Sequence, residues 1–145
     1  MVNDHLQSRF PRLKESAYCV TSPQSVFYNC IAWAAGDTNR PWWPDALFQY
    51  YWPKDAPREV NLEAFCAAFS PLGYRPCETG EPEEGFEKVA IYNSPDGKPT
   101  HMARQLRLGV WTSKLGDLED IEHSLEGLEG SAYGSVAFFL KRARR

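Results

Sequence analysis

The chain lacks any long apolar run, and none of its segments approaches the roughly 18 continuous apolar residues that cross a bilayer. Residues 1–10 are polar, without the apolar core of a signal peptide. Net positive charge is also absent, since 16 basic and 19 acidic side chains give −3. Such a balance provides no electrostatic basis for binding nucleic acid. The sequence therefore predicts a soluble, cytoplasmic protein that binds neither nucleic acid nor membrane.

Cysteine and histidine are scarce. The four cysteines include no CxxC pair, and nothing indicates secretion, so reduced thiols are expected. The three histidines, His5, His101 and His123, are too widely spaced for the paired ligands of a zinc site. No metal and no other cofactor is expected, and the sequence does not indicate an oligomeric state.

Apolar side chains are plentiful, at 43% of the 145 residues, which is enough for one globular domain over residues 1–145 with its own core. Hydrophobic periodicity and turn residues predict an α+β domain with helices against an antiparallel sheet. The predicted helices cover 25–36, 62–70 and 118–128, with a short one after Pro44. The predicted strands cover 74–77, 88–92, 100–106, 110–114 and 133–140. We interpret the remaining segments as an arm (1–22), an exposed acidic connection (78–87) and a solvated basic end (141–145).

Cys30 lies at or near the amino end of the helix expected over 25–36. Residues 21–23 are helix-start residues, and Gly36 ends the helix. A cysteine in the first helical turn is close to unpaired N–H groups and to the positive end of the helix dipole, which favour the thiolate. Cys30 is therefore a candidate nucleophile. The alternative is a small apolar residue packed in the core beside Ile31.

A nucleophilic thiol needs a base within hydrogen-bond reach, and His101 is the best placed histidine. It stands at the start of the strand 100–106, where a side chain at the rim of a sheet can meet the end of a packed helix. Small Ala103, on the same face of that strand, allows a helix to approach closely. The alternative is an ordinary, partly buried histidine.

Aromatic side chains crowd the segment that follows the Cys30 helix. They are candidates for the walls of a substrate cleft, with Trp42, Trp43 and Trp52 as the residues that bind substrate, although aromatic side chains more often pack in the core. The full set is Trp42, Trp43, Phe48, Tyr50, Tyr51 and Trp52.

Two segments carry a resemblance to known proteins, namely YNCIAWA at 28–34 and PTHMARQ at 99–105. Their order and placement resemble the papain-like arrangement of small bacterial cysteine peptidases and amidases of the NlpC and CHAP kinds. Over nearly its whole length the chain is also similar to a small bacterial family, a domain of unknown function, that shares YNCIAWA, WTSKLG (111–116) and a following Ile-x-His (121–123).

The papain-like resemblance implies that Cys30 is the nucleophile and that His101 is the general base and then the acid. Backbone N–H groups around Asn29 and Cys30 would contribute to an oxyanion hole, although Asn29 is also a natural helix cap. The third, orienting residue would come from the next strand, where Ser113 is the polar candidate. Glu122 and His123 are the alternatives, on a helix whose acidic residues otherwise read as a solvated face.

These features predict a cysteine hydrolase, either a peptidase or amidase or an acyltransferase, that acts on a peptide or another amide-containing substrate. A second hypothesis is a catalytically silent module of the same fold that holds a peptide or sugar in an aromatic cleft. A third is a toxin or effector domain that uses the same chemistry.

Overall fold

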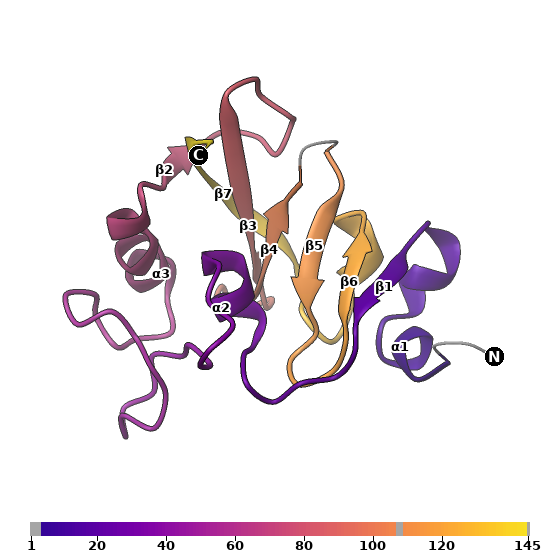
Figure 1. Ribbon diagram of the computed structural model, residues 1–145, viewed down its shortest axis with the longest axis horizontal. Coiled ribbons are helices and arrows are strands. Elements are labelled where there is room, and N and C mark those ends of the chain that lie inside the picture. Colours follow the sequence, from indigo (N-terminus) through magenta and orange to yellow (C-terminus); the bar gives the residue numbers. More distant parts are fainter. Residues whose placement is uncertain (1–3, 107–108, 145) are drawn as a thin grey trace.

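The computed structural model describes residues 4–106 and 109–144, and over these ranges the chain forms an antiparallel sheet with short helices on both of its faces (Figure 1). Seven strands follow one another across the sheet in the order β1-β6-β5-β4-β3-β7-β2. The α+β class predicted from the sequence is confirmed. The strands are β1 (Cys19–Ser22), β2 (Arg75–Cys77), β3 (Phe86–Asn93), β4 (Pro99–Gln105), β5 (Trp111–Lys114), β6 (Asp120–His123) and β7 (Ser135–Ala143); the helices are α1 (Asp4–Arg9), α2 (Cys30–Ala35) and α3 (Leu62–Phe69), and the 3-10 turns are η1 (Pro11–Glu15), η2 (Ser70–Leu72) and η3 (Glu126–Leu128).

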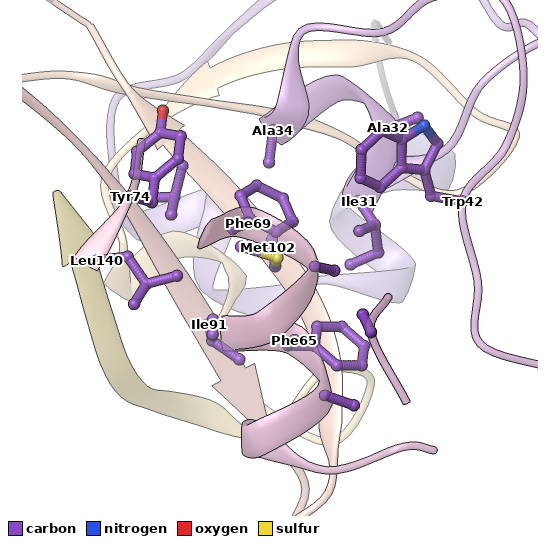
Figure 2. Close-up of a cluster of buried hydrophobic side chains, with 14 of the residues drawn as sticks. Ile31, Ala32, Ala34, Trp42, Phe65, Phe69, Tyr74, Ile91, Met102 and Leu140 are labelled. Atoms are coloured by element: carbon purple, nitrogen blue, oxygen red, sulfur yellow. The ribbon is translucent and has the colours of Figure 1, made fainter. Parts of the chain in front are cut away.

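Two apolar clusters cover the sheet, one on each face. In the first, Ile31 of α2 and Phe65 and Phe69 of α3 pack with Ile91 and Met102 of the central strands (Figure 2). Alternation along a strand sends neighbouring side chains to opposite faces. The residues next to Ile91 and Met102 therefore belong to the other layer.

The second cluster fills the opposite face, beneath the amino-terminal segment. Leu6 of α1, Leu13 of η1 and Leu128 of η3 pack there with Ala90 and Ala103 of β3 and β4. The sequence predicts an arm over this region, and from residue 4 onward that arm contains regular elements, including β1, which pairs with β6.

The short helix predicted over 25–36 is present, but it begins later than expected. α2 starts at Cys30 because the Asn29 side chain caps it, with Oδ1 accepting the Ala32 N–H at 3.1 Å. Gly36 ends it with φ +86°, a left-handed conformation that glycine adopts without a Cβ clash. The thiol therefore lies at the first helical position.

A polar contact fixes α2 on β4 and β5, against which it packs. The Trp33 indole N–H donates to Oγ1 of Thr112 at 3.1 Å. The Arg104 guanidinium lies over the same indole, with its carbon 5.0 Å from the ring centroid. These contacts determine how the thiol at the start of α2 meets the sheet.

The helix predicted after Pro44 is absent, and residues 44–51 form an irregular loop. The Asp45 carboxylate accepts hydrogen bonds from the backbone N–H groups of Gln49 and Tyr50 at 2.7 and 3.1 Å, which closes the chain into a turn. Phe48 has φ +59°, which a bulky side chain rarely adopts. A carboxylate that binds the backbone in this way competes with helix formation. By contrast, α3 forms as predicted, with Asn61 as its cap.

The helix predicted over 118–128 is also wrong, because this segment forms β6 and then η3. β6 pairs antiparallel with both β5 and β1, so the sheet satisfies its backbone on two sides. Ile121 and Leu128 are both buried in the second cluster, yet they reach it from a strand and from a turn. Asp120, expected on a solvated helix face, is fully buried.

The basic end predicted as a solvated tail is largely part of the sheet. β7 continues to Ala143, and Lys141 pairs with Glu83 at 2.8 Å. Arg142 pairs with Glu87 at 2.7 Å. The acidic connection thus supplies the counter-ions for the basic strand. None of the helices in the described ranges has the length and apolarity needed to traverse a bilayer.

Candidate functional site

Cys30 lies where the start of α2 meets β4, and its side chain is nearly closed off, with the residue 7% exposed. Burial raises the pKa of the thiol to about 11. Hydrogen bonds from the backbone of Met102, Ile31 and Cys30 itself, together with the charge of Lys114, act in the opposite direction and only partly offset this effect. The resting sulfur is therefore a neutral thiol at pH 7.

His101 is fully buried on the other side of the sheet from the body of α2. Its ring stacks on Tyr133, with centroids 4.0 Å apart, and meets the edge of Tyr92, its partner in the β3–β4 register. No hydrogen bond joins His101 to Cys30 within the described part of the chain. The expected meeting of thiol and imidazole at one junction is thus only partly present: the sulfur contacts the backbone of Met102, the next residue along β4, but the imidazole turns to the opposite face.

The structure instead brings His101 together with two of the three candidates for the orienting residue. Nε2 of His101 lies 2.9 Å from Oγ of Ser113, which lies 2.7 Å from Nε2 of His123. Nδ1 of His123 lies 2.6 Å from the carbonyl oxygen of Ser124. These side chains form a buried line across β4, β5 and β6, which we call the His-Ser-His relay. Glu122, the third candidate, points to the opposite face of β6.

The carbonyl of Ser124 fixes the direction of every hydrogen bond in the relay. A carbonyl can only accept, so Nδ1 of His123 carries the proton. Burial lowers the pKa of His123 to about 4, so the ring is neutral at pH 7 and its Nε2 accepts from the Ser113 hydroxyl. Oγ of Ser113 then accepts from the N–H at Nε2 of His101.

The remaining ring nitrogen of His101, Nδ1, carries no proton. Burial, with a smaller effect of His123, holds the pKa of His101 well below its usual range, so this ring is neutral too. Because its proton lies on Nε2, Nδ1 carries an unprotonated lone pair. Nδ1 is also buried without a hydrogen-bond partner among the described residues. The relay therefore presents one unprotonated nitrogen with no hydrogen-bond partner among the described residues.

Asn29 acts as the cap of α2 and as a tie to the aromatic loop. Beside the cap contact, its Oδ1 accepts the Trp42 N–H at 3.0 Å and its Nδ2 donates to the Trp42 carbonyl at 2.8 Å. The Asn29 amide is thus committed to α2 through its oxygen and to the Trp42 carbonyl through Nδ2, which favours the cap interpretation over a role as oxyanion donor.

The three tryptophans expected to bind substrate lie in different environments. Trp42 and Trp52 are buried in the first cluster, 5% and 3% exposed, and do not form a cleft wall. The Trp42 indole donates to Asp37 at 2.9 Å and the Trp52 indole to the Pro57 carbonyl at 2.8 Å, so their polar atoms are satisfied inside the protein. Only Trp43, half-buried, reaches an open hollow.

A polar cluster beside the thiol is not foreseen from the sequence. Nζ of the buried Lys114 donates to the carbonyls of Ser25 and Gly116 at 2.8 and 2.7 Å. The Tyr28 hydroxyl donates to the buried Asp120 carboxylate at 2.8 Å. Together these contacts hold the segment that precedes α2. Lys114 could be singled out as a charged residue within a predicted strand, whereas Asp120 could not, because its segment has the periodicity of a helix.

Over the described ranges, no group of three or more histidine, cysteine or acidic side chains is placed to hold a metal ion.

A family model for a domain of unknown function, DUF7689, matches residues 19–141. Since this match covers most of the sequence, the chain belongs to that family. No curated protein and no solved structure matches the chain.

Proposed function

We propose that the protein is a cysteine hydrolase of papain-like arrangement, in which Cys30 attacks an amide-type carbonyl and His101 is the base. The observation that carries this proposal is the polarity of the His-Ser-His relay, which leaves an unprotonated nitrogen on His101. A base held in one tautomer by a second group is the arrangement that activates a nucleophile. Ser113 and His123 act as positioning residues.

The reaction would proceed through an acyl-enzyme. Nδ1 of His101 takes the proton of the Cys30 thiol, and the sulfur bonds to the substrate carbonyl carbon. The tetrahedral intermediate collapses, its carbon–nitrogen bond breaks, and the leaving amine takes the proton back from His101. Water, deprotonated by the same nitrogen, then cleaves the thioester and regenerates the thiol.

The resting site is closed, so this proposal requires that substrate binding bring the sulfur and Nδ1 together. The segment before α2 is the part that can yield, because Val26 and Phe27 are each 71% exposed and bury little apolar surface. Its anchors are the Lys114 contact to Ser25, the Tyr28 contacts to Asp120 and Trp33, and the Asn29 bonds to Trp42. Moving residues 25–27 alone breaks the Lys114 bond to Ser25 and little of the core.

Covalent trapping tests the proposal. A mixture of peptidyl acyloxymethyl ketones with varied side chains is incubated with the protein at pH 7.5, and the modified residue is mapped by peptide mass spectrometry. The expected label is on Cys30, with loss of labelling in His101→Gln and at least a tenfold slower rate in Ser113→Ala. Cys19→Ala is the matched control, since its exposed thiol touches none of these groups, and it should label as the wild type does.

Two outcomes would reject the hydrolase. One is labelling of Cys19 but not Cys30 in the folded protein. The other is a rate on Cys30 that His101→Gln leaves unchanged, because the imidazole would then have no role as base. Circular dichroism of each variant shows that its fold is retained.

A second candidate, a catalytically silent binding module, is favoured by one observation: the thiol is closed off while an aromatic hollow beside it is open. In that case Cys30→Ser binds peptide ligands as tightly as the wild type, and no peptide is cleaved. Turnover that disappears in Cys30→Ser would exclude this candidate.

A further inference from the structure

An open hollow of about 470 Å³ lies against the start of α2. Tyr28 and Asn29, the two residues that precede the thiol, form part of its wall. Trp43 and Tyr50 come from the aromatic loop, and Asp117 comes from the turn after β5. A ligand in this hollow would therefore contact the two residues that immediately precede Cys30 in the sequence.

The walls offer ring faces and unused polar atoms. Tyr50 is 45% exposed. Among the described residues, the Trp43 indole N–H, the Tyr50 hydroxyl and the Asp117 carboxylate have no hydrogen-bond or ion-pair partner. By contrast, the Tyr28 hydroxyl is committed to Asp120. The hollow thus combines aromatic surface with the Asp117 carboxylate, which interacts with the Lys114 charge only over a longer range.

Among the described residues that line the hollow, Asp117 carries the one charge. No cationic side chain lines it. The nearby Lys114 has its ammonium turned to the carbonyls of Ser25 and Gly116, and it faces Asp120 across the β5–β6 pair. Lys114 and Asp120 offset one another in charge, and Asp117 adds a second carboxylate. The remaining negative charge favours binding of a cation. An ammonium or guanidinium group on an aliphatic stem is complementary to ring faces and a carboxylate together.

We propose that this hollow is a specificity subsite for a lysine or arginine side chain of a peptide, next to the amide that Cys30 attacks. The aliphatic stem packs on Trp43 and Tyr50, and the cationic head reaches Asp117. The assignment of the neighbouring amide rests on the proposed hydrolase, whereas the binding of the side chain does not.

Calorimetric titration of Cys30→Ala, which has no nucleophile, tests the subsite. Nα-acetyl-lysine N-methylamide is compared with the norleucine analogue, which keeps the stem and lacks the charge. At low salt the lysine ligand should bind about tenfold more tightly, a preference expected from cation–π and charge pairing at a partly exposed site. Salt at 0.5 M should reduce the preference.

Asp117→Asn, added to Cys30→Ala, should abolish the preference, while the exposed Asp55→Asn should keep it. Trp43→Phe, which preserves the packing on Phe65, should weaken both ligands. Equal binding of the two ligands, tighter binding of norleucine, absence of binding, or a preference that survives Asp117→Asn would each overturn the subsite. Lysine-selective binding without any labelling of Cys30 by the ketones would instead reject the hydrolase and leave the subsite intact.

Discussion

Acidification provides a direct measure of the buried relay. The pKa of His123 is lowered to about 4 by burial, against an ordinary value of 6.5, and that of His101 is lowered well below 6.5. As pH falls below 6.5, the unfolded chain binds a proton at each imidazole while the native protein does not. The free energy of unfolding must therefore fall with pH, and this contribution is complete only above pH 6.5.

The magnitude for His123 follows from the two pKa values. Between pH 7 and pH 5 its linkage lowers the free energy of unfolding by about 2 kcal/mol, and by about 3 kcal/mol at pH 4. His101 adds to the loss in the same direction. The pH 7 to 5 interval is the informative one, because carboxylates with lowered pKa values, such as Asp37 and Asp45, contribute mainly below it.

Urea unfolding at pH 7, 6 and 5, followed by tryptophan fluorescence and circular dichroism, gives the slope of the free energy of unfolding against pH. His123→Gln removes one titrating ring and keeps an acceptor for the Ser113 hydroxyl, so its slope should be shallower by about 2 kcal/mol over this interval. Gln49→Asn, an exposed substitution that adds and removes no titrating group, is the control and should retain the wild-type pH dependence. A flat wild-type profile, or a His123→Gln variant as steep as the wild type, would refute a neutral buried relay.

Three further outcomes follow from particular contacts. Lys114→Met leaves the buried Asp120 carboxylate without its counter-charge and should cost roughly 2 to 4 kcal/mol by urea unfolding, with much of the loss restored by adding Asp120→Asn. Gly134→Ala should cost more than about 2 kcal/mol in the same assay, because φ is +81° and a Cβ would overlap the Asn93 carbonyl; a neutral result would contradict that geometry. Iodoacetamide at pH 7 should alkylate Cys30 more slowly than any other thiol in the native protein, and equal rates by mass spectrometry would contradict the closed, neutral resting thiol.

The sequence predicts best those elements whose local chemistry and tertiary role agree. The capping side chains of Asn29 and Asn61 and the terminating Gly36 locate α2 and α3 to within a few residues. The hairpin of β3 and β4 is likewise predicted, because strand-like segments at 88–92 and 100–106 flank turn residues at 94–97. In each case the signal lies within a few residues of the element itself.

The wrong predictions concern segments whose structure is decided by pairing with residues far away in the sequence. Residues 118–128 carry apolar side chains at helical spacing, yet β1 and β5 lie on either side of this segment and take up its backbone hydrogen bonds as β6. β1 is itself part of a region without a sustained sequence period. No local pattern records that residues 19–22 and 120–123 meet, so the strand and its buried Asp120 are missed together.

The helix wrongly predicted over 118–128 also hides one member of the candidate site. A helix at 118–128 leaves His123 as a surface alternative to Ser113, whereas β6 places both on one line with His101. The direction of that line is set at its far end, because the Ser124 carbonyl can only accept and burial disfavours a second proton on His123. Reversing the relay would require a charged imidazole in the core, which costs free energy without a paired carboxylate. The tautomer of His101 is therefore fixed by a backbone carbonyl two strands away, and any residue that holds the β5–β6 register contributes to it.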